Sequence, residues 1–364
     1  MIYFDNLKFA LQPSGGISVV WYELVKRMLE NKELDCRFID YPDGDKNQFR
    51  QLLDIAPEKI INKKGYYRNF QKYLPYVRLT EKEKFIFHSS HYRICTSSKA
   101  VNFTTVHDFT YEMFFRGMKE NRAIFRELHS FVKGASVRNS ERIICISENT
   151  KRDLLYYYPK IEENKVNVIY NGVSDDYKLL SDDEKGEYIN DSFLKDSLLF
   201  VGSRDFYKNF EKAVIAISQT EFNLVIVGGG AITNQESMLL EKYLGVKRWK
   251  KYDYVSNAEL NMLYNLVRGL IYPSVYEGFG IPILEAQRAG APVVAFWGSS
   301  IPEVGGDAVS YFYNNNECNI LESIKRLESD DFCNDLSQKG LINSRRFSWD
   351  KNYEEVLKLY KLYL

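Results

Sequence analysis

The stretch that decides the fold reads Tyr272-Pro273-Ser274-Val275-Tyr276-Glu277-Gly278-Phe279-Gly280-Ile281-Pro282-Ile283-Leu284-Glu285-Ala286. The apolar run 269–272 that leads into it has the character of a strand, and Pro282 suits the first turn of a helix. Gly278 and Gly280 allow the connecting loop backbone conformations that other residues avoid. At the start of such a helix, unpaired N–H groups and a partial positive charge attract phosphate. The stretch therefore predicts a strand, a glycine loop and a helix whose N-terminus binds an anionic ligand.

Two carboxylates bracket this loop. Glu277 stands before the turn and Glu285 stands one turn inside the helix, with seven residues between them. A carboxylate beside a diphosphate would repel it, so each glutamate is better suited to accept hydrogen bonds from hydroxyl groups. The loop then points to a ligand with both phosphate and sugar, and a structural turn with two solvated glutamates is the alternative. The spacing around Gly-Phe-Gly-Ile-Pro resembles the Glu-x7-Glu signature of the retaining glycosyltransferases of family 4.

Length and composition limit the classes of protein to consider. A chain of 364 residues is too long for one ordinary core, so two domains are expected. The 49 basic and 49 acidic side chains balance, which argues against a dedicated nucleic-acid binder. Five widely spaced cysteines without a Cys-x-x-Cys pair favour a reducing, cytoplasmic setting and no zinc site. The amino terminus lacks the features of a signal peptide and no apolar run is long enough to span a membrane, so neither export nor a membrane span is expected.

A second strand, glycine loop and helix open the chain. Residues 2–4 read as the strand, 12–17 as the loop, and the apolar positions that follow recur at helical spacing. A plain turn is the alternative for the glycine pair. The family resemblance implies that Gly15 and Gly16 approach the donor diphosphate and border the acceptor site.

His107-Asp108 follows a predicted strand, at the strand end where open α/β sheets bind ligands. A hydrogen-bonded structural pair is the alternative. The Thr-Val-His-Asp segment is similar to the family's motif whose histidine lies near the donor sugar. His88 and His91 are expected in a loop without metal, since two histidines with no third ligand nearby are too few.

Residues 59–78 combine cations with aromatic side chains and contain no acidic residue. The cations are Lys59, Lys63, Lys64, Arg68, Lys72 and Arg78, with five aromatic residues among them. This pattern suits peripheral contact with an anionic membrane or a polyanionic acceptor. A solvated helical face with aromatic core residues is the alternative.

Arg204 and Lys208 follow a predicted strand at 198–201. Two cations there fit a leaving diphosphate, whose charge must be neutralised as the sugar bond breaks. The segment resembles the family's diphosphate clamp, although Tyr207 stands where an arginine is frequent. An exposed first-turn lysine is the alternative for Lys208.

Gly228-Gly229-Gly230 follows another buried strand but does not form Gly-x-Gly-x-x-Gly, so a nicotinamide dehydrogenase is disfavoured. The resemblance implies that the backbone around Tyr254 and Val255 flanks the nucleotide base.

The chain divides near Asn171-Gly172-Val173, a turn that closes the first Rossmann-like domain in the resembled family. Residues 176–196 are rich in Asp, Lys and Ser with little periodicity. We therefore expect a first domain at 1–175, a linker at 176–196 and a second domain at 197–348. The resemblance implies that the last helix, within 349–364, crosses back onto the first domain.

The alternation of strands and helices predicts an α/β protein, and the family resemblance implies the GT-B fold, in which two Rossmann-like domains face each other across a central cleft. Overall resemblance to bacterial polysaccharide mannosyltransferases implies retaining transfer of a hexose from a sugar nucleotide, first GDP-mannose, to a glycan or lipid-linked glycan without metal or other cofactor. The diphosphate would contact Arg204, Lys208 and the amides of Gly278, Phe279, Gly280 and Ile281; Glu285 would accept the ribose hydroxyls; Glu277 and His107 would orient the hexose. A sugar-nucleotide epimerase of the same fold and a non-catalytic sugar-nucleotide sensor are the alternatives.

Overall fold

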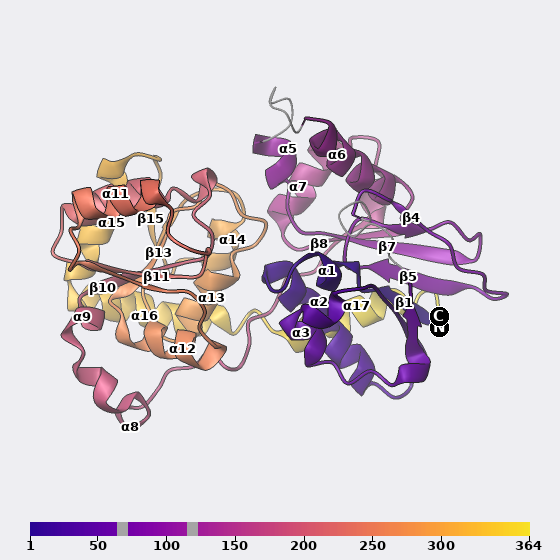
Figure 1. Ribbon diagram of the computed structural model, residues 1–364, viewed down its shortest axis with the longest axis horizontal. Helices are drawn as coiled ribbons and strands as arrows, with labels where there is room; N and C mark the ends of the chain where they lie inside the picture. Colours follow the sequence, from indigo (N-terminus) through magenta and orange to yellow (C-terminus); the bar gives the residue numbers. More distant parts are fainter. Residues whose placement is uncertain (64–71, 115–122) are drawn as a thin grey trace. The chain divides into compact units, whose positions relative to one another are not determined.

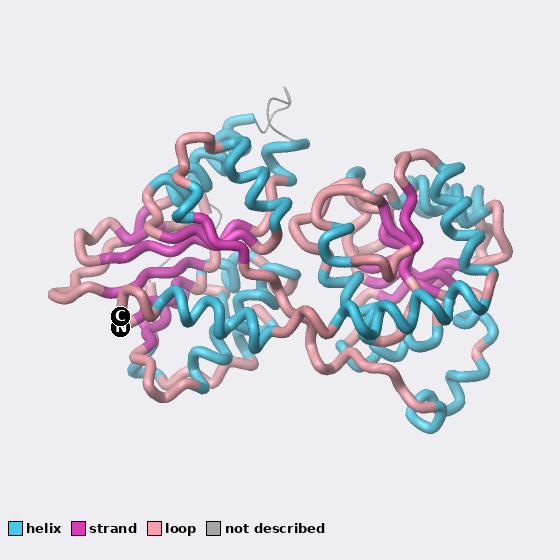
Figure 2. Tube along the Cα trace, turned by 180° about the vertical axis from the view of Figure 1, so that it is seen from behind, coloured by secondary structure: helices cyan, strands magenta, loops and turns pink. Residues whose placement is uncertain are grey.

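The structure, a computed structural model, describes residues 1–63, 72–114 and 123–364. It forms two compact units, one comprising Met1–Gly172 with Trp349–Leu364 and the other Val173–Ser348. Within each unit, helices flank a parallel β-sheet (Figure 1; Figure 2). The predicted α/β architecture with two Rossmann-like domains is confirmed.

The sheet of the first unit has the strand order β3-β2-β1-β5-β7-β8-β9 within the described residues. Its strands are β1 (Ile2–Asp5), β2 (Cys36–Asp40), β3 (Ile60–Asn62), β5 (Phe85–Ser89), β7 (Ala100–Val106), β8 (Arg142–Cys145) and β9 (Val166–Val168), and β4 (Tyr76–Val77) pairs separately with β6 (Ile94–Cys95). All these pairings are parallel. His88 lies inside β5, and not in the loop that the sequence suggested, because every residue of this strand is buried.

The helices of the first unit are α1 (Leu7–Leu11), α2 (Gly16–Glu30), α3 (Gln48–Gln51), α5 (Thr110–Phe114), α6 (Ala123–Arg138), α7 (Glu148–Tyr157) and α17 (Trp349–Tyr360), with 3-10 turns η1 (Gly44–Lys46), η2 (Pro57–Lys59) and η3 (Glu163–Lys165). The predicted first unit of strand, glycine loop and helix is present as β1, the loop before Gly16, and α2. Helix α1 lies between β1 and that loop and was not predicted. It forms because Leu7, Phe9 and Ala10 are buried on one face.

Helix α17 lies in the first unit beside α2 (Figure 1). Tyr360 is fully buried in the core that also contains Phe4, Trp21 and Phe38. Two polar contacts join the helices as well: Arg27 Nε donates to Asp350 Oδ1 (2.7 Å) and Asn31 Nδ2 to Tyr353 Oη (2.9 Å). Burial of a large aromatic side chain contributes on the order of 2 kcal/mol, so this terminal segment is an integral part of the first core.

The second unit has the strand order β12-β11-β10-β13-β14-β15, all parallel. Its strands are β10 (Ser197–Val201), β11 (Asn223–Val227), β12 (Trp249–Tyr252), β13 (Gly269–Tyr272), β14 (Val293–Phe296) and β15 (Ser310–Phe312). Its helices are α8 (Asp182–Lys185), α9 (Ser192–Lys195), α10 (Phe210–Ser218), α11 (Asn234–Tyr243), α12 (Asn257–Leu266), α13 (Ile281–Arg288), α14 (Ile301–Gly305), α15 (Glu317–Lys325) and α16 (Asp330–Ser344), with η4 (Gly186–Asn190), η5 (Phe206–Lys208) and η6 (Arg326–Glu328). Central strands such as β13 are buried along their whole length, as parallel strands covered on both faces must be.

The linker predicted at 176–196 is wrong, because this segment belongs to the second unit. Tyr177 and Leu194 are buried there. Asn261 and Asn265 of α12 accept hydrogen bonds from the backbone N–H groups of residues 178 and 180, at 3.0 and 2.8 Å. The polar composition that suggested a linker reflects the exposed side of a segment that is attached to α12 by its backbone.

Candidate functional site

The central loop has the predicted form of a strand, a glycine turn and a helix. Gly280 precedes α13 with a φ of +109°, a conformation that side chains other than glycine rarely adopt, and Pro282 stands in the first turn. Phe279 is buried against Phe347, with ring centroids 5.7 Å apart. In the described part of the chain, no protein group accepts the amide hydrogen of Gly280 or Ile281. Two donors at a helix N-terminus are therefore available to an anion.

Ser300 fixes the other side of this loop. Its Oγ donates to the backbone carbonyls of Glu277 and Phe279, both at 2.9 Å. The Glu277 N–H in turn donates to Ser299 Oγ at 2.9 Å. The loop is thus fastened to the segment after β14, and Gly278 lies between the two anchored carbonyls. Neither serine was singled out from the sequence, where Ser299-Ser300 reads as an ordinary polar turn.

Lys208 and Glu277 form an ion pair. Lys208 Nζ lies 2.5 Å from Glu277 Oε1, and both side chains are 14% exposed. Lys208 comes from η5 after β10, and its ammonium also lies over the rings of Tyr207 and Tyr272, 5.4 and 5.5 Å from their centroids. Burial, with a contribution from Glu277, raises the pKa of Tyr272 well above its ordinary value. The structure therefore brings together the predicted phosphate cation and the predicted sugar carboxylate.

Glu285 lies in α13 beneath a tyrosine pair. Tyr264 of α12 donates a hydrogen bond from Oη to Glu285 Oε2 at 3.1 Å, and the Tyr264 ring contacts Tyr177 with centroids 6.0 Å apart. Burial raises the pKa of Glu285 to about 7, although the hydrogen bonds from Tyr264 and Tyr177 act in the opposite direction. Glu285 is thus a carboxyl group that titrates near neutral pH. Both tyrosines were missed from the sequence, since only tertiary packing brings them to α13.

Arg204 does not have the geometry of a phosphate clamp. Its Nε donates to Glu236 Oε1 at 2.6 Å, and the side chain is 3% exposed. Its terminal nitrogens donate to the carbonyl oxygens of Gly228, Gly229, Gly230 and Ala231, at 2.9 to 3.2 Å. The three glycines have φ values of +74° to +77°, which turns their carbonyls toward this one guanidinium. Arg204 therefore organises the loop after β11 and is not placed as a phosphate clamp, which corrects its predicted role, while the contact of Lys208 with a diphosphate stays a prediction.

Tyr254 and Val255 follow β12, in the loop before α12. Tyr254 is 70% exposed. A capping box follows them: Ser256 and Glu259 exchange side-chain and backbone hydrogen bonds at the start of α12. These residues stand at the carboxyl end of a strand at the edge of the sheet, and their contact with a nucleotide base stays a prediction.

The other predicted residues lie in the first unit. Gly15 is the N-cap of α2 with a φ of +142°, and Gly16 is the first residue of that helix. His107 follows β7, and burial lowers its pKa to about 4, so its imidazole is neutral at physiological pH. Asp108 Oδ1 accepts a hydrogen bond from the backbone N–H of Thr110, the first residue of α5, at 3.0 Å. The roles of Gly15, Gly16 and His107 stay predictions.

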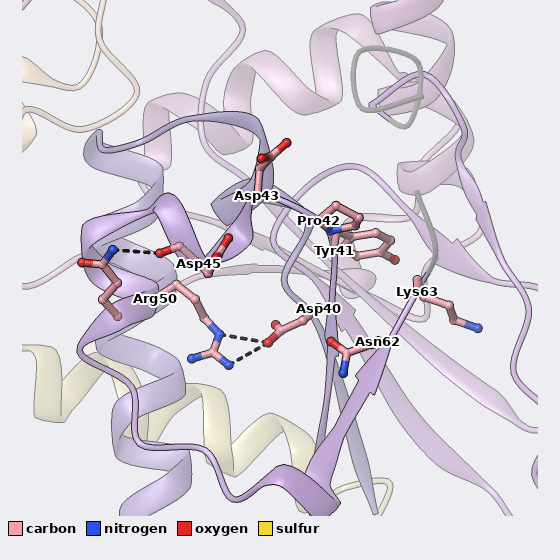
Figure 3. Close-up of a pocket in the computed structure, with 9 residues that line it drawn as sticks. Asp40, Tyr41, Pro42, Asp43, Asp45, Arg50, Asn62 and Lys63 are labelled. Carbon is pink, nitrogen blue, oxygen red and sulfur yellow. Dashed lines mark hydrogen bonds and ion pairs between the residues drawn. The ribbon is translucent and has the colours of Figure 1, made fainter. Parts of the chain in front are cut away.

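A polar pocket of about 680 Å³ opens at the carboxyl ends of β2 and β3 in the first unit (Figure 3). It is lined by Asp40, Tyr41, Pro42, Asp43, Asp45, Arg50, Gln51, Asn62 and Lys63. Arg50 binds Asp40 through two nitrogens, at 3.0 and 2.7 Å (Figure 3). Carboxylate, amide and ammonium groups suit a ligand rich in hydroxyl groups. Of this lining, the sequence had drawn attention only to Lys63.

Two further expectations concern a metal site and contact with a membrane, and the structure bears on them only within the residues that it describes. Within 1–63, 72–114 and 123–364, no group of His, Cys, Asp or Glu side chains is arranged to hold a metal ion. In the same ranges, no helix is both long and apolar enough to cross a membrane. The basic and aromatic segment 59–78 falls partly on residues 64–71, which lie outside the described residues, so its predicted membrane contact stays a prediction.

Comparison with known proteins agrees with this geometry. The family model described as Glycosyltransferase Family 4 matches residues 14–177, and that described as Glycosyl transferases group 1 matches residues 194–342. The chain is 37% identical to the O-antigen chain mannosyltransferase B of Escherichia coli over 117 residues, which are 31% of this chain and 30% of that protein. It is 28% identical to the O-antigen chain mannosyltransferase RfbU of Salmonella typhimurium over 206 residues, 54% of each chain. These alignments thus span between about a third and a half of the relatives' lengths.

Among solved structures, a crystal structure of Anabaena HepE in complex with UDP and glucose superimposes with a TM-score of 0.75 and 13% identity, covering 99% of both chains. A likeness at this identity shows the fold, which is GT-B. The two family models together match most of both units. The matches therefore identify the chain as a glycosyltransferase of the family 4 type.

Proposed function

We propose that the protein transfers a hexose, with retention of anomeric configuration, from a nucleotide-diphosphate sugar to a glycan or lipid-linked glycan in polysaccharide biosynthesis. The observation that carries this proposal is the Lys208–Glu277 pair at the N-terminus of α13. One partner suits a departing diphosphate and the other suits sugar hydroxyls, and both lie beside unused helix amides. Mannosyltransferase relatives favour a mannose donor, with GDP-mannose first.

Each group then has one part in the transfer. The Gly280 and Ile281 amides and Lys208 stabilise charge on the diphosphate as the sugar bond breaks. Glu277 accepts hexose hydroxyls, and Glu285 accepts the ribose hydroxyls. The acceptor hydroxyl attacks the anomeric carbon on the face that the diphosphate leaves, and the departing phosphate oxygen takes the acceptor proton. The polar pocket of the first unit supports an acceptor rich in hydroxyl groups.

The epimerase alternative needs an additional acid or base. His88 and His107 are the candidates for such a group. The ring nitrogens of His88 hydrogen-bond to Tyr360 Oη (2.5 Å) and Thr105 Oγ1 (2.9 Å), and its side chain is fully buried. Burial also lowers the pKa of His88 to about 3. A group enclosed in this way is a poor proton carrier for a substrate, which favours transfer over epimerisation.

A donor panel tests the proposal. The protein is incubated with GDP-mannose and with UDP-hexoses, with and without a panel of oligosaccharide acceptors, and release of nucleoside diphosphate is measured. Transfer predicts release that increases with acceptor and a glycan product longer by one hexose. An altered sugar nucleotide without release indicates the epimerase, and binding without any turnover indicates the sensor.

A further inference from the structure

Two exposed aromatic side chains stand at the carboxyl edge of the second sheet. Trp297 directly follows β14 and is 47% exposed, and Tyr313 directly follows β15 and is 69% exposed. Their ring centroids lie 5.5 Å apart with 35° between the planes. Tyr311 supports Trp297 from the edge, at 4.8 Å. Of the four tryptophans in the chain, Trp297 is the exposed one. Adjacent exposed aromatic rings are typical of surfaces that bind a ligand or a partner molecule.

On the Trp297 side, hydrogen bonds connect this surface to Glu277, the glutamate that is proposed to bind the sugar hydroxyls. The Trp297 N–H donates to the carbonyl of Phe312 at 2.9 Å, which extends the pairing of β14 with β15. Two residues further on, Ser299 Oγ accepts the Glu277 N–H at 2.9 Å. One backbone hydrogen bond at Trp297 and one bond from the Glu277 backbone to the Ser299 side chain therefore anchor this short segment to β15 and to the central loop.

On the Tyr313 side, hydrogen bonds connect this surface to the residue next to Lys208, the lysine that is proposed to bind phosphate. Asn209, the residue after Lys208, has a left-handed backbone with a φ of +53°. Its Nδ2 donates to the Pro273 carbonyl at 2.9 Å, at the end of β13, and to Asn315 Oδ1 at 2.7 Å, in the loop that carries Tyr313. One buried amide thus joins the loops after β10, β13 and β15.

The order of strands separates three places along this edge. The predicted base contact at 254–255 follows β12, which is one end of the sheet, and Lys208 and Glu277 follow β10 and β13 in the middle. Trp297 and Tyr313 follow β14 and β15, which is the other end. A donor whose base lies at the β12 end and whose hexose lies at Glu277 leaves the β14–β15 end for a different ligand.

We propose that Trp297 and Tyr313 form an aromatic platform on which a pyranose ring of the acceptor glycan stacks. This inference rests on the proposed function, and it assigns an acceptor subsite to the second unit. The C–H face of a pyranose is apolar and slightly positive, which complements the negative face of an indole or phenol ring, while the sugar hydroxyls remain at the edge in contact with water. Such a platform selects for the ring and its orientation without any charge on the ligand.

Four variants test the platform: Trp297→Ala, Tyr313→Ala, the conservative Trp297→Phe, and Tyr156→Ala as a control. Tyr156 is a 78% exposed tyrosine on α7 of the first unit and belongs to no predicted site. Stacking of a ring pair contributes up to about 1.5 kcal/mol, so we expect each alanine variant of the platform to raise the acceptor KM by about tenfold. Trp297→Phe should recover most of the loss, and Tyr156→Ala should match the wild type. The kcat at saturating acceptor and the calorimetric affinity for nucleoside diphosphate should stay within about twofold in all four.

Calorimetric titration of wild type and Trp297→Ala with short manno- and gluco-oligosaccharides gives a second readout that needs no turnover. Weaker binding by Trp297→Ala supports the platform, whereas equal binding, or no binding by either protein, overturns it. An unchanged acceptor KM also overturns it, and so does a parallel loss of nucleoside diphosphate affinity, since the rings would then stack on the base. If the wild type neither binds nucleoside diphosphate nor turns over any donor, the proposed function fails, and the oligosaccharide titration still decides the platform separately.

Discussion

Lys208 and Glu277 form an ion pair, with Nζ 2.5 Å from Oε1 and both side chains largely buried. A diphosphate that enters this site therefore competes with a carboxylate for the same ammonium. In the proposed function, pairing would hold the lysine in place before the donor arrives, and the donor would draw the lysine from one anion to the other. In the proposed function, binding of phosphate to Lys208 would thus release the Glu277 carboxylate from its ion pair.

Replacement of Lys208 tests the cation. Lys208→Met removes a charged hydrogen bond worth roughly 1.5 to 3 kcal/mol, so affinity for nucleoside diphosphate should fall by about ten- to a hundredfold. Lys208→Arg keeps the charge with a different geometry and should lose less. The matched control is Lys212→Met, since Lys212 Nζ donates to the Asn315 carbonyl at 2.7 Å, whereas the ion pair of Glu277 is with Lys208. Calorimetric titration measures all three, and equal affinities of Lys208→Met and wild type would assign the diphosphate to other groups.

Metal independence is a second prediction. Charge neutralisation is assigned to Lys208 and to the amides at the start of α13, which need no divalent ion. Donor turnover should therefore be the same with and without EDTA. Activity that is abolished by the chelator and restored by Mn²⁺ or Mg²⁺ would contradict this assignment.

Some of this site could be predicted from the sequence and some could not. Glu277, Gly280 and Lys208 follow from local patterns, because each stands in the connection that follows a recognisable strand. The role of Arg204 could not be predicted, since its guanidinium binds Glu236 and carbonyls more than 20 residues away in sequence.

Tertiary packing also explains the other misses. Tyr177 reaches Glu285 from a segment whose polar composition suggested a linker, and only its contacts with α12 place it. Helix α1 is too short for helical periodicity to reveal it. Residues whose role depends on the strand they follow are thus readable from sequence, while residues that support them from other elements are not.

Membrane contact by residues 59–78 is a third prediction. Each basic residue near an anionic surface contributes on the order of 1 kcal/mol. Cosedimentation with liposomes should therefore increase with phosphatidylglycerol content, and it should decrease when Lys63, Lys64, Arg68 and Lys72 are changed to Ser. The control variant changes Lys195, Lys242, Lys247 and Lys250 of the second unit to Ser, with the same loss of charge. If cosedimentation does not depend on phosphatidylglycerol content, or if it decreases equally in both variants, the segment is an ordinary solvated surface.

The raised pKa of Glu285, about 7, gives a pH prediction. The carboxylate form is the acceptor for ribose hydroxyls, so donor affinity should increase as pH rises through about 7. Tyr264→Phe removes a hydrogen bond that favours the carboxylate, and it should shift this increase to higher pH. Affinity for nucleoside diphosphate measured between pH 5.5 and 8.5 checks the profile, and a profile that is flat in the wild type contradicts it.

The free energy of unfolding should change with pH in the opposite direction to donor affinity. The folded protein holds the Glu285 proton up to about pH 7, whereas the unfolded chain releases it near the ordinary value of about 4.3. The unfolded state then binds fewer protons in this window, so this group lowers the stability of the ligand-free protein as pH rises from about 4.3 to 7. The decrease in Tm over this range should be smaller in Glu285→Gln than in the wild type.

The two glutamates should fail differently when each is replaced. Glu285→Ala removes an acceptor for ribose hydroxyls, a contact made in the ground state and the transition state alike, so donor binding should weaken by about ten- to a hundredfold and the loss should fall mainly on donor KM. Glu277→Ala removes the group that orients the hexose while charge develops at the anomeric carbon, so it should lower kcat by a larger factor.

The Lys208–Glu277 ion pair adds an expectation for the nucleotide affinity of Glu277→Ala. Because Glu277→Ala also removes the anion that competes for Lys208, its affinity for nucleoside diphosphate should be equal to or higher than that of the wild type. Calorimetry with nucleoside diphosphate beside steady-state kinetics measures both effects. A loss of nucleotide affinity in Glu277→Ala with none in Glu285→Ala would reverse the two roles. Full turnover in both variants would show that this loop is not the transfer site, because no group in it would then act on the hexose.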